Sequence, residues 1–163
     1  TNQPGVAKKT ISFKDLEAVN RRLAALLAKE GGRWDALYYC PHHPGSGRGG
    51  AASSRFVRAC CCRKPRPGLL LKAASDHGID LAASWLVGDG LNDIQAGKAA
   101  GCRTVLLPRL KIEQIERFLG VEGGVPDVIA PNFDVAAALI LRNRTVRASA
   151  RGGRRVTGRS VAR

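Results

Sequence analysis

Short apolar runs alternate with helical patterns in the second half of the sequence, and this alternation restricts the fold more than any other feature. The apolar runs, which have the length and composition of buried strands, are Trp85–Val87, Thr104–Leu107 and Val128–Ile129. The helical segments run from Asn92, a candidate cap, to about Ala100, over Ile112–Leu119 and over Val135–Leu141. Strands and helices in alternation predict an α/β fold, a parallel sheet with helices on both faces.

The first half contains fewer regular elements. Ser12 and Asp15 have the spacing of a capping box before a helical pattern of apolar residues that Gly31 and Gly32 end. That pattern consists of Leu16, Val19, Leu23, Leu26 and Leu27. We predict a short strand over Ala36–Tyr39, a long loop from Pro41 to about Pro67, and a helix around Leu69–His77.

The formal net charge of +14 is concentrated at the C-terminus. No acidic residue follows Asp134, whereas residues 142–163 contain eight arginines and little apolar content. We therefore predict one domain over residues 1–141 and a disordered Arg-rich tail over 142–163. The rest of the chain is moderately basic, which suits an anionic substrate and does not by itself imply nucleic acid.

Neither a membrane span nor a secretory signal is recognisable. No apolar run approaches the ~18–20 residues needed to cross a bilayer, and no basic segment followed by an apolar stretch opens the chain. The five cysteines are odd in number and three are adjacent, which fits metal binding in a reducing compartment better than disulfides. We expect a cytoplasmic protein, a monomer with no membrane partner.

Cysteine and histidine supply the strongest local motif, Cys40-Pro-His42 together with Cys60-Cys-Cys62. Three thiolates and one imidazole make a closed tetrahedral set typical of structural zinc. We predict the ligands Cys40, His42, Cys60 and Cys62, because alternate residues can point toward one centre. His43 and Cys61 are the ambiguous neighbours, and free thiols on a loop are the alternative.

Three further segments are candidates for phosphate and metal binding. The cations of Arg63-Lys64-Pro65-Arg66 suit phosphate oxygens, although a solvated basic turn is the alternative. Asp89 ends a predicted strand before a helix, a position suited to Mg²⁺, whereas Asp93 can simply complement the helix dipole. The opening residues Thr1 to Gly5 offer a hydroxyl and backbone N–H groups to a phosphoryl group.

The order of these motifs resembles the zinc-containing phosphatases of the haloacid-dehalogenase (HAD) superfamily, most closely the D-glycero-D-manno-heptose 1,7-bisphosphate 7-phosphatase family. The resemblance implies a Rossmann-like HAD fold with a zinc-bound loop. It implies that Thr1 binds phosphate, that Lys64 stabilises the transferring phosphoryl group, and that Arg63 contacts substrate. It places Asn2, Gln3 and Pro4 in the substrate pocket, with Gly90 nearby. Asp89 and Gly90 would hold Mg²⁺, and Asp93 would support that metal site.

The sequence departs from the family in several places. Pro4 stands where serine is common, Cys61 where aspartate is common and Gly90 where lysine is common, and the zinc loop is long. The family's nucleophile is the first aspartate of an Asp-x-Asp motif, and no Asp-x-Asp occurs in the 163 residues. We therefore expect a fragment in which the nucleophile lies upstream and the first strand of the sheet is missing. Such a fragment should be inert and poorly soluble.

The resemblance implies an Mg²⁺-dependent phosphatase of a phosphorylated sugar, which removes the 7-phosphate of the heptose bisphosphate in lipopolysaccharide-core precursor (ADP-heptose) synthesis. Histidinol-phosphate phosphatase, on a similar zinc scaffold, is the alternative. A non-catalytic zinc module that binds nucleic acid through the Arg-rich tail is a further one. A chain with only 5% aromatic residues offers few stacking platforms for bases, so we consider nucleic acid an unlikely partner.

Overall fold

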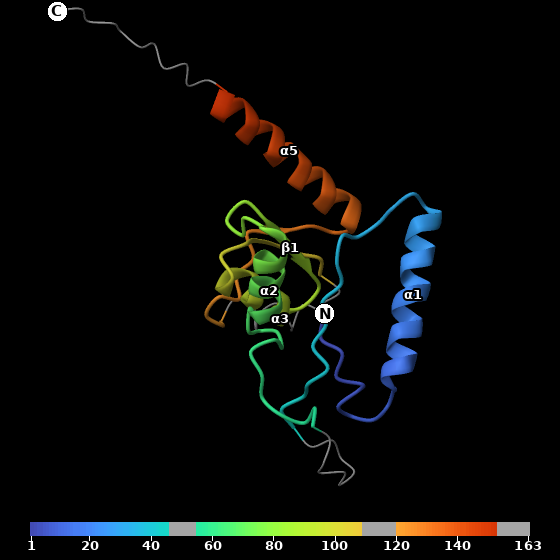
Figure 1. The fold of residues 1–163 in the computed structure, drawn as a ribbon. Helices are drawn as coiled ribbons and strands as arrows, with labels where there is room; N and C mark the ends of the chain where they lie inside the picture. Colours follow the sequence, from blue (N-terminus) through green and yellow to red (C-terminus); the bar gives the residue numbers. More distant parts are fainter. Residues whose placement is uncertain (46–54, 109–119, 153–163) are drawn as a thin grey trace, which may run out of the picture.

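The C-terminal half of the chain is built on a three-stranded parallel sheet (Figure 1). The structure, a computed structural model, describes residues 1–45, 55–108 and 120–152. The strands are β1 (Trp85–Gly88), β2 (Arg103–Leu106) and β3 (Val128–Ile129), adjacent in that order. All three lie within one residue of the predicted runs, and their parallel pairing confirms the predicted class of fold.

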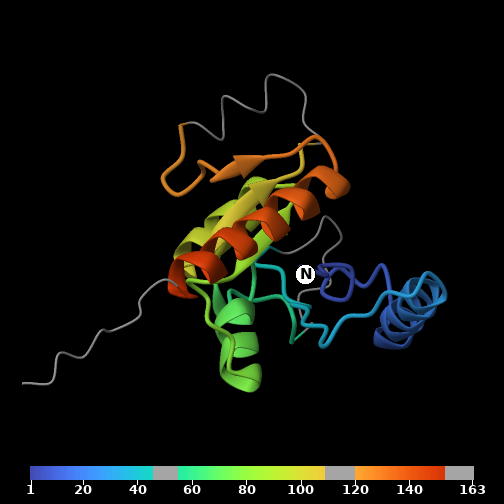
Figure 2. The same ribbon diagram turned by 90° about the horizontal axis from the view of Figure 1, so that it is seen from above.

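Helices cover both faces of this sheet, as predicted. Leu106 of β2 belongs to a buried cluster with Ile94 of α3 (Leu91–Ala99). The preceding residue of the strand, Val105, packs with Ala136 of α5 (Phe133–Gly152). Successive side chains of a strand point to opposite faces, so α3 and α5 lie on opposite sides of β2. Figure 2 shows the strands between these two helices.

A network of polar side chains, of which Thr104 is the buried member, joins the segment before β3 to β2. Thr104 is fully buried. Its backbone nitrogen and its hydroxyl donate hydrogen bonds to the Asp127 carboxylate, at 2.6 Å and 2.9 Å. Lys98 of α3 donates to the other carboxylate oxygen at 2.6 Å. Burial opposes ionisation, but the hydrogen bonds from Lys98 and Thr104 outweigh it and lower the pKa of Asp127. The ionised carboxylate thus joins three elements around the sheet.

The N-terminal half contains helices α1 (Phe13–Lys29) and α2 (Gly68–His77). The predicted capping box is present: the Ser12 hydroxyl accepts from the Asp15 nitrogen at 3.1 Å, and the Asp15 carboxylate accepts from the Ser12 nitrogen at 3.0 Å. Two isolated parallel bridges, Asn2 with Cys40 and His43 with Val57, organise the remaining backbone. This half therefore depends on few backbone pairs between distant segments.

Helix α1 stands away from the sheet in two perpendicular views (Figures 1 and 2). Leu16 is buried near its N-terminus, but Val19, Leu23 and Leu26 on the same apolar stripe are 61%, 51% and 44% exposed. The amphipathic pattern thus predicted the helix correctly. Within the described residues, only the start of the stripe is covered.

A predicted strand and a predicted helix cap differ from the structure. Residues 36–39 do not form a strand; the pairing there is the single bridge of Cys40 with Asn2. The residue at the N-cap of α3 is Gly90 rather than Asn92, which lies inside the helix. The Asp93 carboxylate accepts from the Gly90 nitrogen at 3.1 Å, so the acid in the first turn performs the capping that we assigned to Asn92.

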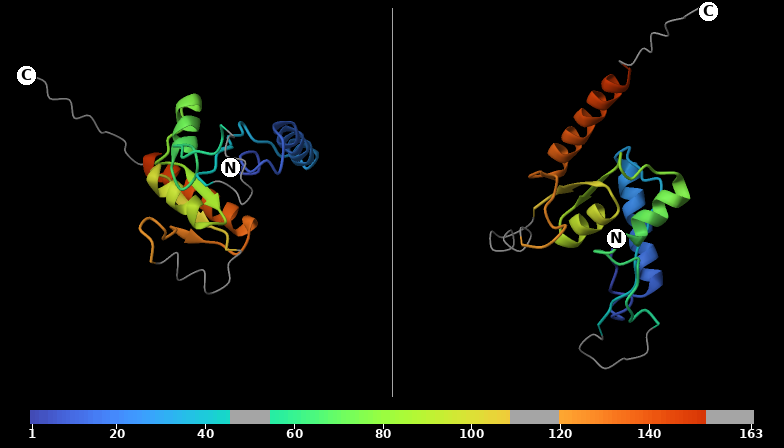
Figure 3. Two further views of the ribbon diagram at one scale, coloured as in Figure 1. Left: turned by 90° about the horizontal axis from the view of Figure 1, so that it is seen from below. Right: turned by 90° about the vertical axis from the view of Figure 1, so that its left-hand side faces the viewer.

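The last helix is longer than predicted. Helix α5 continues from Leu141 to Gly152, into the segment for which we predicted no structure (Figure 3). Arginine and alanine have high intrinsic helix propensity, so the composition that we interpreted as disorder is compatible with a helix. The rest of the tail, 153–163, and the helix predicted over Ile112–Leu119 lie outside the described residues.

One edge of β1 carries no strand in the described part of the chain, because β1 pairs with β2 alone. We expected an incomplete sheet, and this edge is where another strand can pair. None of the helices that the structure describes combines the length and apolarity needed to cross a membrane.

Candidate metal and phosphate site

The four predicted zinc ligands form one compact cluster. Their ligand atoms all lie within 4.8 Å of one another. The Cys62 sulfur is 3.2 Å from that of Cys40 and 3.4 Å from both the Cys60 sulfur and His42 Nδ1. Cys40 is 3.5 Å from both His42 Nδ1 and the Cys60 sulfur. Segments about twenty residues apart in the sequence thus converge on one point.

The spacing of these atoms fits a tetrahedral zinc ion. Five of the six distances between the four ligand atoms are 3.2–3.5 Å, and the sixth, between His42 and Cys60, is at most 4.8 Å. A regular tetrahedron with edges like the first five has its centre about 2.0–2.1 Å from each corner, close to the ~2.0–2.3 Å of zinc–nitrogen and zinc–sulfur bonds. The ambiguous neighbours lie elsewhere: Cys61 is exposed, and His43 Nδ1 contacts the backbone of Gly45. The geometry therefore favours the predicted choice of His42 and of alternate cysteines.

The three thiols of the metal-free cluster do not ionise alike. Burial opposes ionisation of Cys60, but hydrogen bonds with Cys62 and Cys40 outweigh it and lower the pKa of that thiol. Burial, and then hydrogen bonds to Cys40 and Cys60, raise the pKa of Cys62 to about 12. Burial also raises the pKa of Cys40 and lowers that of His42. Three thiols packed together cannot all ionise without a cation, so metal binding here must displace protons.

The cluster is joined directly to the opening residues. The Cys40 nitrogen donates to the Thr1 carbonyl at 2.9 Å, and the Gln3 nitrogen donates to the Cys40 carbonyl at 2.8 Å. These two bonds form the parallel bridge that places Asn2 beside Cys40. A metal that fixes Cys40 therefore also fixes the segment from Thr1 to Gln3.

Lys64 lies two residues after Cys62 and reaches the end of β1. Its ammonium forms an ion pair with Asp93 of α3, and both side chains are largely buried. The close approach of Asp93 requires a glycine at the end of β1, because a Cβ at Gly88 would lie 2.2 Å from the Asp93 Cβ. Thr1 is close too, because the next residue, Asn2, is hydrogen-bonded to the backbone of Lys64.

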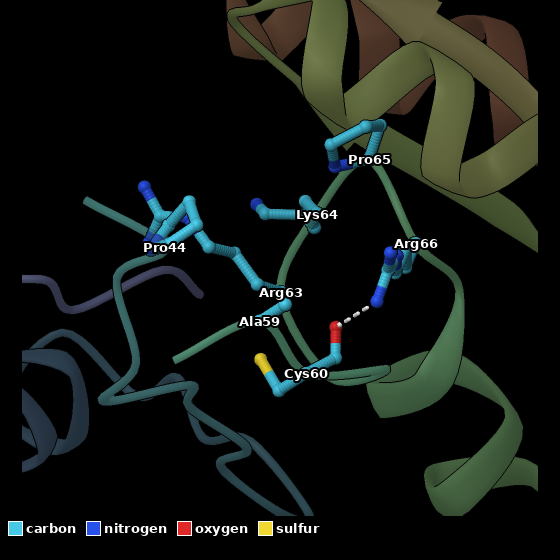
Figure 4. A pocket seen from close by; sticks show the side chains of 7 residues that line it. All are labelled: Pro44, Ala59, Cys60, Arg63, Lys64, Pro65 and Arg66. Carbon is cyan, nitrogen blue, oxygen red and sulfur yellow. Dashed lines mark hydrogen bonds between the residues drawn. The ribbon is translucent and has the colours of Figure 1, made fainter. Parts of the chain in front are cut away.

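A basic cavity of about 190 Å³ lies between the cluster and Lys64 (Figure 4). Its lining contains Arg63, Lys64 and Arg66, and also Pro44, Ala59, Cys60 and Pro65. Arg63 donates to the His42 carbonyl at 3.0 Å, and Arg66 donates to the Cys60 carbonyl at 3.0 Å. The two guanidinium groups are thus held against the cysteine–histidine loop, each with further N–H groups that can meet an anion.

The structure brings some of the predicted residues together and leaves others apart. Thr1, Lys64 and Asp93 are neighbours, whereas neither Thr1 nor Asp89 lines the basic cavity. Asp89 is exposed at the end of β1, with its carboxylate available to a cation. Gln3 and Pro4 are half-buried close to the bridge with Cys40.

Two contacts of the site were not predicted. Asp93 pairs with Lys64, where we had assigned it to support of a metal. The Asn2 amide, which we placed in the substrate pocket, is hydrogen-bonded to the backbone of Lys64. These residues are 29 and 62 positions from Lys64, and no local spacing signals such a contact.

Comparison with known proteins gives the site its context. The HAD-hydrolase-like family pattern matches residues 61–112, which include Lys64, Asp89 and Asp93. D-glycero-beta-D-manno-heptose-1,7-bisphosphate 7-phosphatase of Pseudomonas putida is 37% identical over 137 residues, 84% of this chain and 69% of the relative. The chain belongs to this phosphatase family. The enzymes of the same name from Pseudomonas aeruginosa and Escherichia coli are 38% and 40% identical over 107 and 109 residues.

Solved structures agree with this family. The D,D-heptose 1,7-bisphosphate phosphatase of B. bronchiseptica, complexed with magnesium and phosphate, has a TM-score of 0.67 at 30% identity. The match covers 88% of this chain and 72% of that one. A HAD-like phosphatase from Mesorhizobium loti has a TM-score of 0.68 at 28% identity, over 90% of this chain and 64% of that one.

The chain is shorter than these phosphatases. It spans 53% of the P. aeruginosa enzyme and 54% of the E. coli enzyme. The match to the P. putida enzyme is longer, at 69%. The chain therefore belongs to this family over about half to two thirds of the length of these relatives.

Proposed function

We propose that this chain carries the phosphate-binding part of a phosphatase that removes the 7-phosphate from D-glycero-β-D-manno-heptose 1,7-bisphosphate. The observation that carries the proposal is the position of Lys64. Its ammonium lies beside Asp93 at the carboxyl end of a parallel strand, the edge at which ligands bind in such sheets. The heptose-bisphosphate phosphatases to which the chain is similar support this choice of substrate.

In the proposed reaction Lys64 stabilises the charge of the transferring phosphoryl group. Asp93 directs the Lys64 ammonium to the end of β1 through their ion pair. Thr1 donates its hydroxyl to a phosphoryl oxygen, and Arg63 contacts the substrate with the N–H groups that its bond to His42 leaves available. Such preorganised donors stabilise charge that develops in the transition state, because they need not reorient.

The nucleophile is an aspartate from outside residues 1–163, which attacks phosphorus to form an aspartyl-phosphate. Two facts support this: the sequence contains no Asp-x-Asp, and Asp93 is already engaged by Lys64 and the Gly90 nitrogen. A second upstream acid protonates the leaving sugar oxygen and then activates water. Water hydrolyses the aspartyl-phosphate and releases inorganic phosphate.

Two metals belong to the proposal. Cys40, His42, Cys60 and Cys62 hold zinc, and their sulfur and nitrogen donors suit that ion. Asp89 and Gly90 hold Mg²⁺, with Asp93 in a supporting position; the exposed Asp89 carboxylate at the end of β1 is an oxygen donor that suits a hard cation. When bound, Mg²⁺ neutralises charge on the phosphate oxygens. We further propose that the enzyme is a cytoplasmic monomer without a membrane or nucleic-acid partner.

Substrate preference tests the proposal. A protein in which the upstream segment precedes Thr1 is expected to hydrolyse the heptose bisphosphate at least about ten times faster, as kcat/KM, than histidinol phosphate. A pocket built to pair with sugar hydroxyls leaves polar groups unpaired when another substrate binds, and this costs transition-state stabilisation. Preference for histidinol phosphate would assign the chain to the alternative reaction, and activity on neither would remove the proposal.

A further inference from the structure

The side-chain amide of Asn2 makes a two-point contact with the backbone of Lys64. Asn2 Nδ2 donates to the Lys64 carbonyl at 3.1 Å, and the Lys64 nitrogen donates to Asn2 Oδ1 at 3.1 Å. A primary amide presents a donor and an acceptor side by side, so it satisfies both backbone groups of one residue at once. Both bonds are partly buried and join segments 62 residues apart.

Lys64 needs such a partner because its backbone belongs to no helix or strand. The segment from Arg63 to Arg66 is a turn, in which the Arg66 nitrogen donates to the Arg63 carbonyl at 2.9 Å. Outside a helix or sheet, the two backbone groups of a half-buried residue have no ladder to satisfy them. The Asn2 amide satisfies the Lys64 carbonyl and backbone nitrogen, as a neighbouring strand would in a sheet.

Asn2 is itself held in place by a zinc-cluster residue. The bonds on either side of it, Cys40 nitrogen to Thr1 carbonyl and Gln3 nitrogen to Cys40 carbonyl, fix its backbone. Lys64 follows the cluster residue Cys62 by two positions. The amide therefore bridges the two segments that the cluster gathers, next to the functional cation.

We propose that Asn2 is a positioning residue, which fixes the backbone of Lys64 and thereby directs the Lys64 ammonium at the phosphoryl group. Lys64 is then held at both ends, by Asn2 at its backbone and by Asp93 at its ammonium. This role rests on the proposed phosphatase function and deepens it. It differs from the role first expected for Asn2, because the amide acts through Lys64 and does not contact the substrate.

A double-mutant cycle separates positioning from substrate contact. In the full protein with zinc and Mg²⁺, Asn2→Ala is expected to weaken binding of inorganic phosphate about tenfold, measured by calorimetry, because a small misplacement of a charged group costs much of its effect. In a Lys64→Ala background the same change should have almost no further effect, because nothing remains to be positioned. A substrate-contacting Asn2 would instead lose a similar factor in both backgrounds.

Hydrogen exchange at the Lys64 backbone amide measures its contact with Asn2 directly. The Lys64 amide should exchange at least about tenfold faster in Asn2→Ala than in the unaltered protein, because its acceptor is gone. Asn20→Ala, a change of the same type on α1, should alter neither exchange at Lys64 nor phosphate affinity. Unchanged exchange in Asn2→Ala, or additive losses in the cycle, would overturn the positioning role. Absence of phosphate binding by the unaltered protein would instead contradict the proposed function on which that role rests.

Discussion

Replacement of Lys64 by alanine is expected to reduce phosphate release about 10²–10³-fold, with a smaller change in KM. One preorganised donor aimed at developing charge contributes about 2.7–4 kcal/mol to the transition state. The ammonium is placed for this by Asp93 at the end of β1 and by Asn2 at its backbone. Steady-state kinetics on the heptose bisphosphate, in protein with the upstream segment, gives the comparison.

Lys72→Ala is the matched control for this prediction. Lys72 also pairs with an aspartate, Asp76, at 2.9 Å, but on the exposed surface of α2. Its removal should leave kcat and KM within about twofold, because an exposed ion pair is worth at most about 1 kcal/mol of stability. Because Lys64→Ala removes the cationic partner of Asp93, the folding of this variant is checked by thermal unfolding and by zinc content. A correctly folded Lys64→Ala protein with full turnover would exclude Lys64 from the mechanism.

Replacement of Cys62 by serine is expected to abolish zinc binding and to release the segment around Lys64 from the cysteine–histidine cluster. Structural zinc contributes about 10–16 kcal/mol of binding free energy in small peptides near neutral pH, as much as the ~5–15 kcal/mol stability of a typical domain. The Cys62 sulfur lies within 3.4 Å of the ligand atoms of the other three cluster residues, so its loss removes one of the four donors. Metal analysis of fresh protein and thermal unfolding measure the effect.

The neighbouring thiol offers a sharp control. Cys61→Ser changes the same atom one residue away, on an exposed side chain outside the cluster. It should retain about one zinc per chain and unfold at the same temperature as the unaltered protein. Equal zinc content in the two variants, or a larger loss in Cys61→Ser, would show that the alternate cysteines were chosen wrongly.

The periodicity of the second half was sufficient to predict its fold. The half-buried run Trp85–Val87 is short, contains branched apolar residues and is followed by Gly88, which distinguishes it from a helix. The first half was harder because its order depends on side-chain contacts rather than on periodicity. The strand predicted near Tyr38 is one bridge at Cys40, a pairing that involves residues 38 positions apart.

Helix ends were predicted less well than helices. The first turn of α3 is stabilised by Asp93, which bonds to the Gly90 nitrogen, so an acid at the third helical position replaced the cap that we expected at Asn92. The extension of α5 to Gly152 was missed because arginine and alanine are good helix formers even without an apolar stripe. In both cases the end of the helix depends on the local residues, an acid in the first turn of α3 and good helix formers at the end of α5, rather than on the apolar pattern.

The candidate site divides in the same way. The cysteine–histidine cluster was predictable because a zinc site restricts both the type and the spacing of its residues, and the structure gathers Cys40, His42, Cys60 and Cys62. The contacts of Lys64 were not predictable, because Asn2 and Asp93 approach it only through the folded chain. Sequence motifs thus predicted candidate metal and phosphate groups, and the structure adds the side chains that contact Lys64.

Phosphorus NMR of the heptose bisphosphate during turnover tests the central claim most directly. The two phosphates of the substrate give separate signals, so the site of cleavage is read from the product. With the upstream segment in place and Mg²⁺ added, the signal of the 7-phosphate should be replaced by that of inorganic phosphate, while the 1-phosphate persists. Release of the 1-phosphate, or no release under these conditions, would contradict the proposed function.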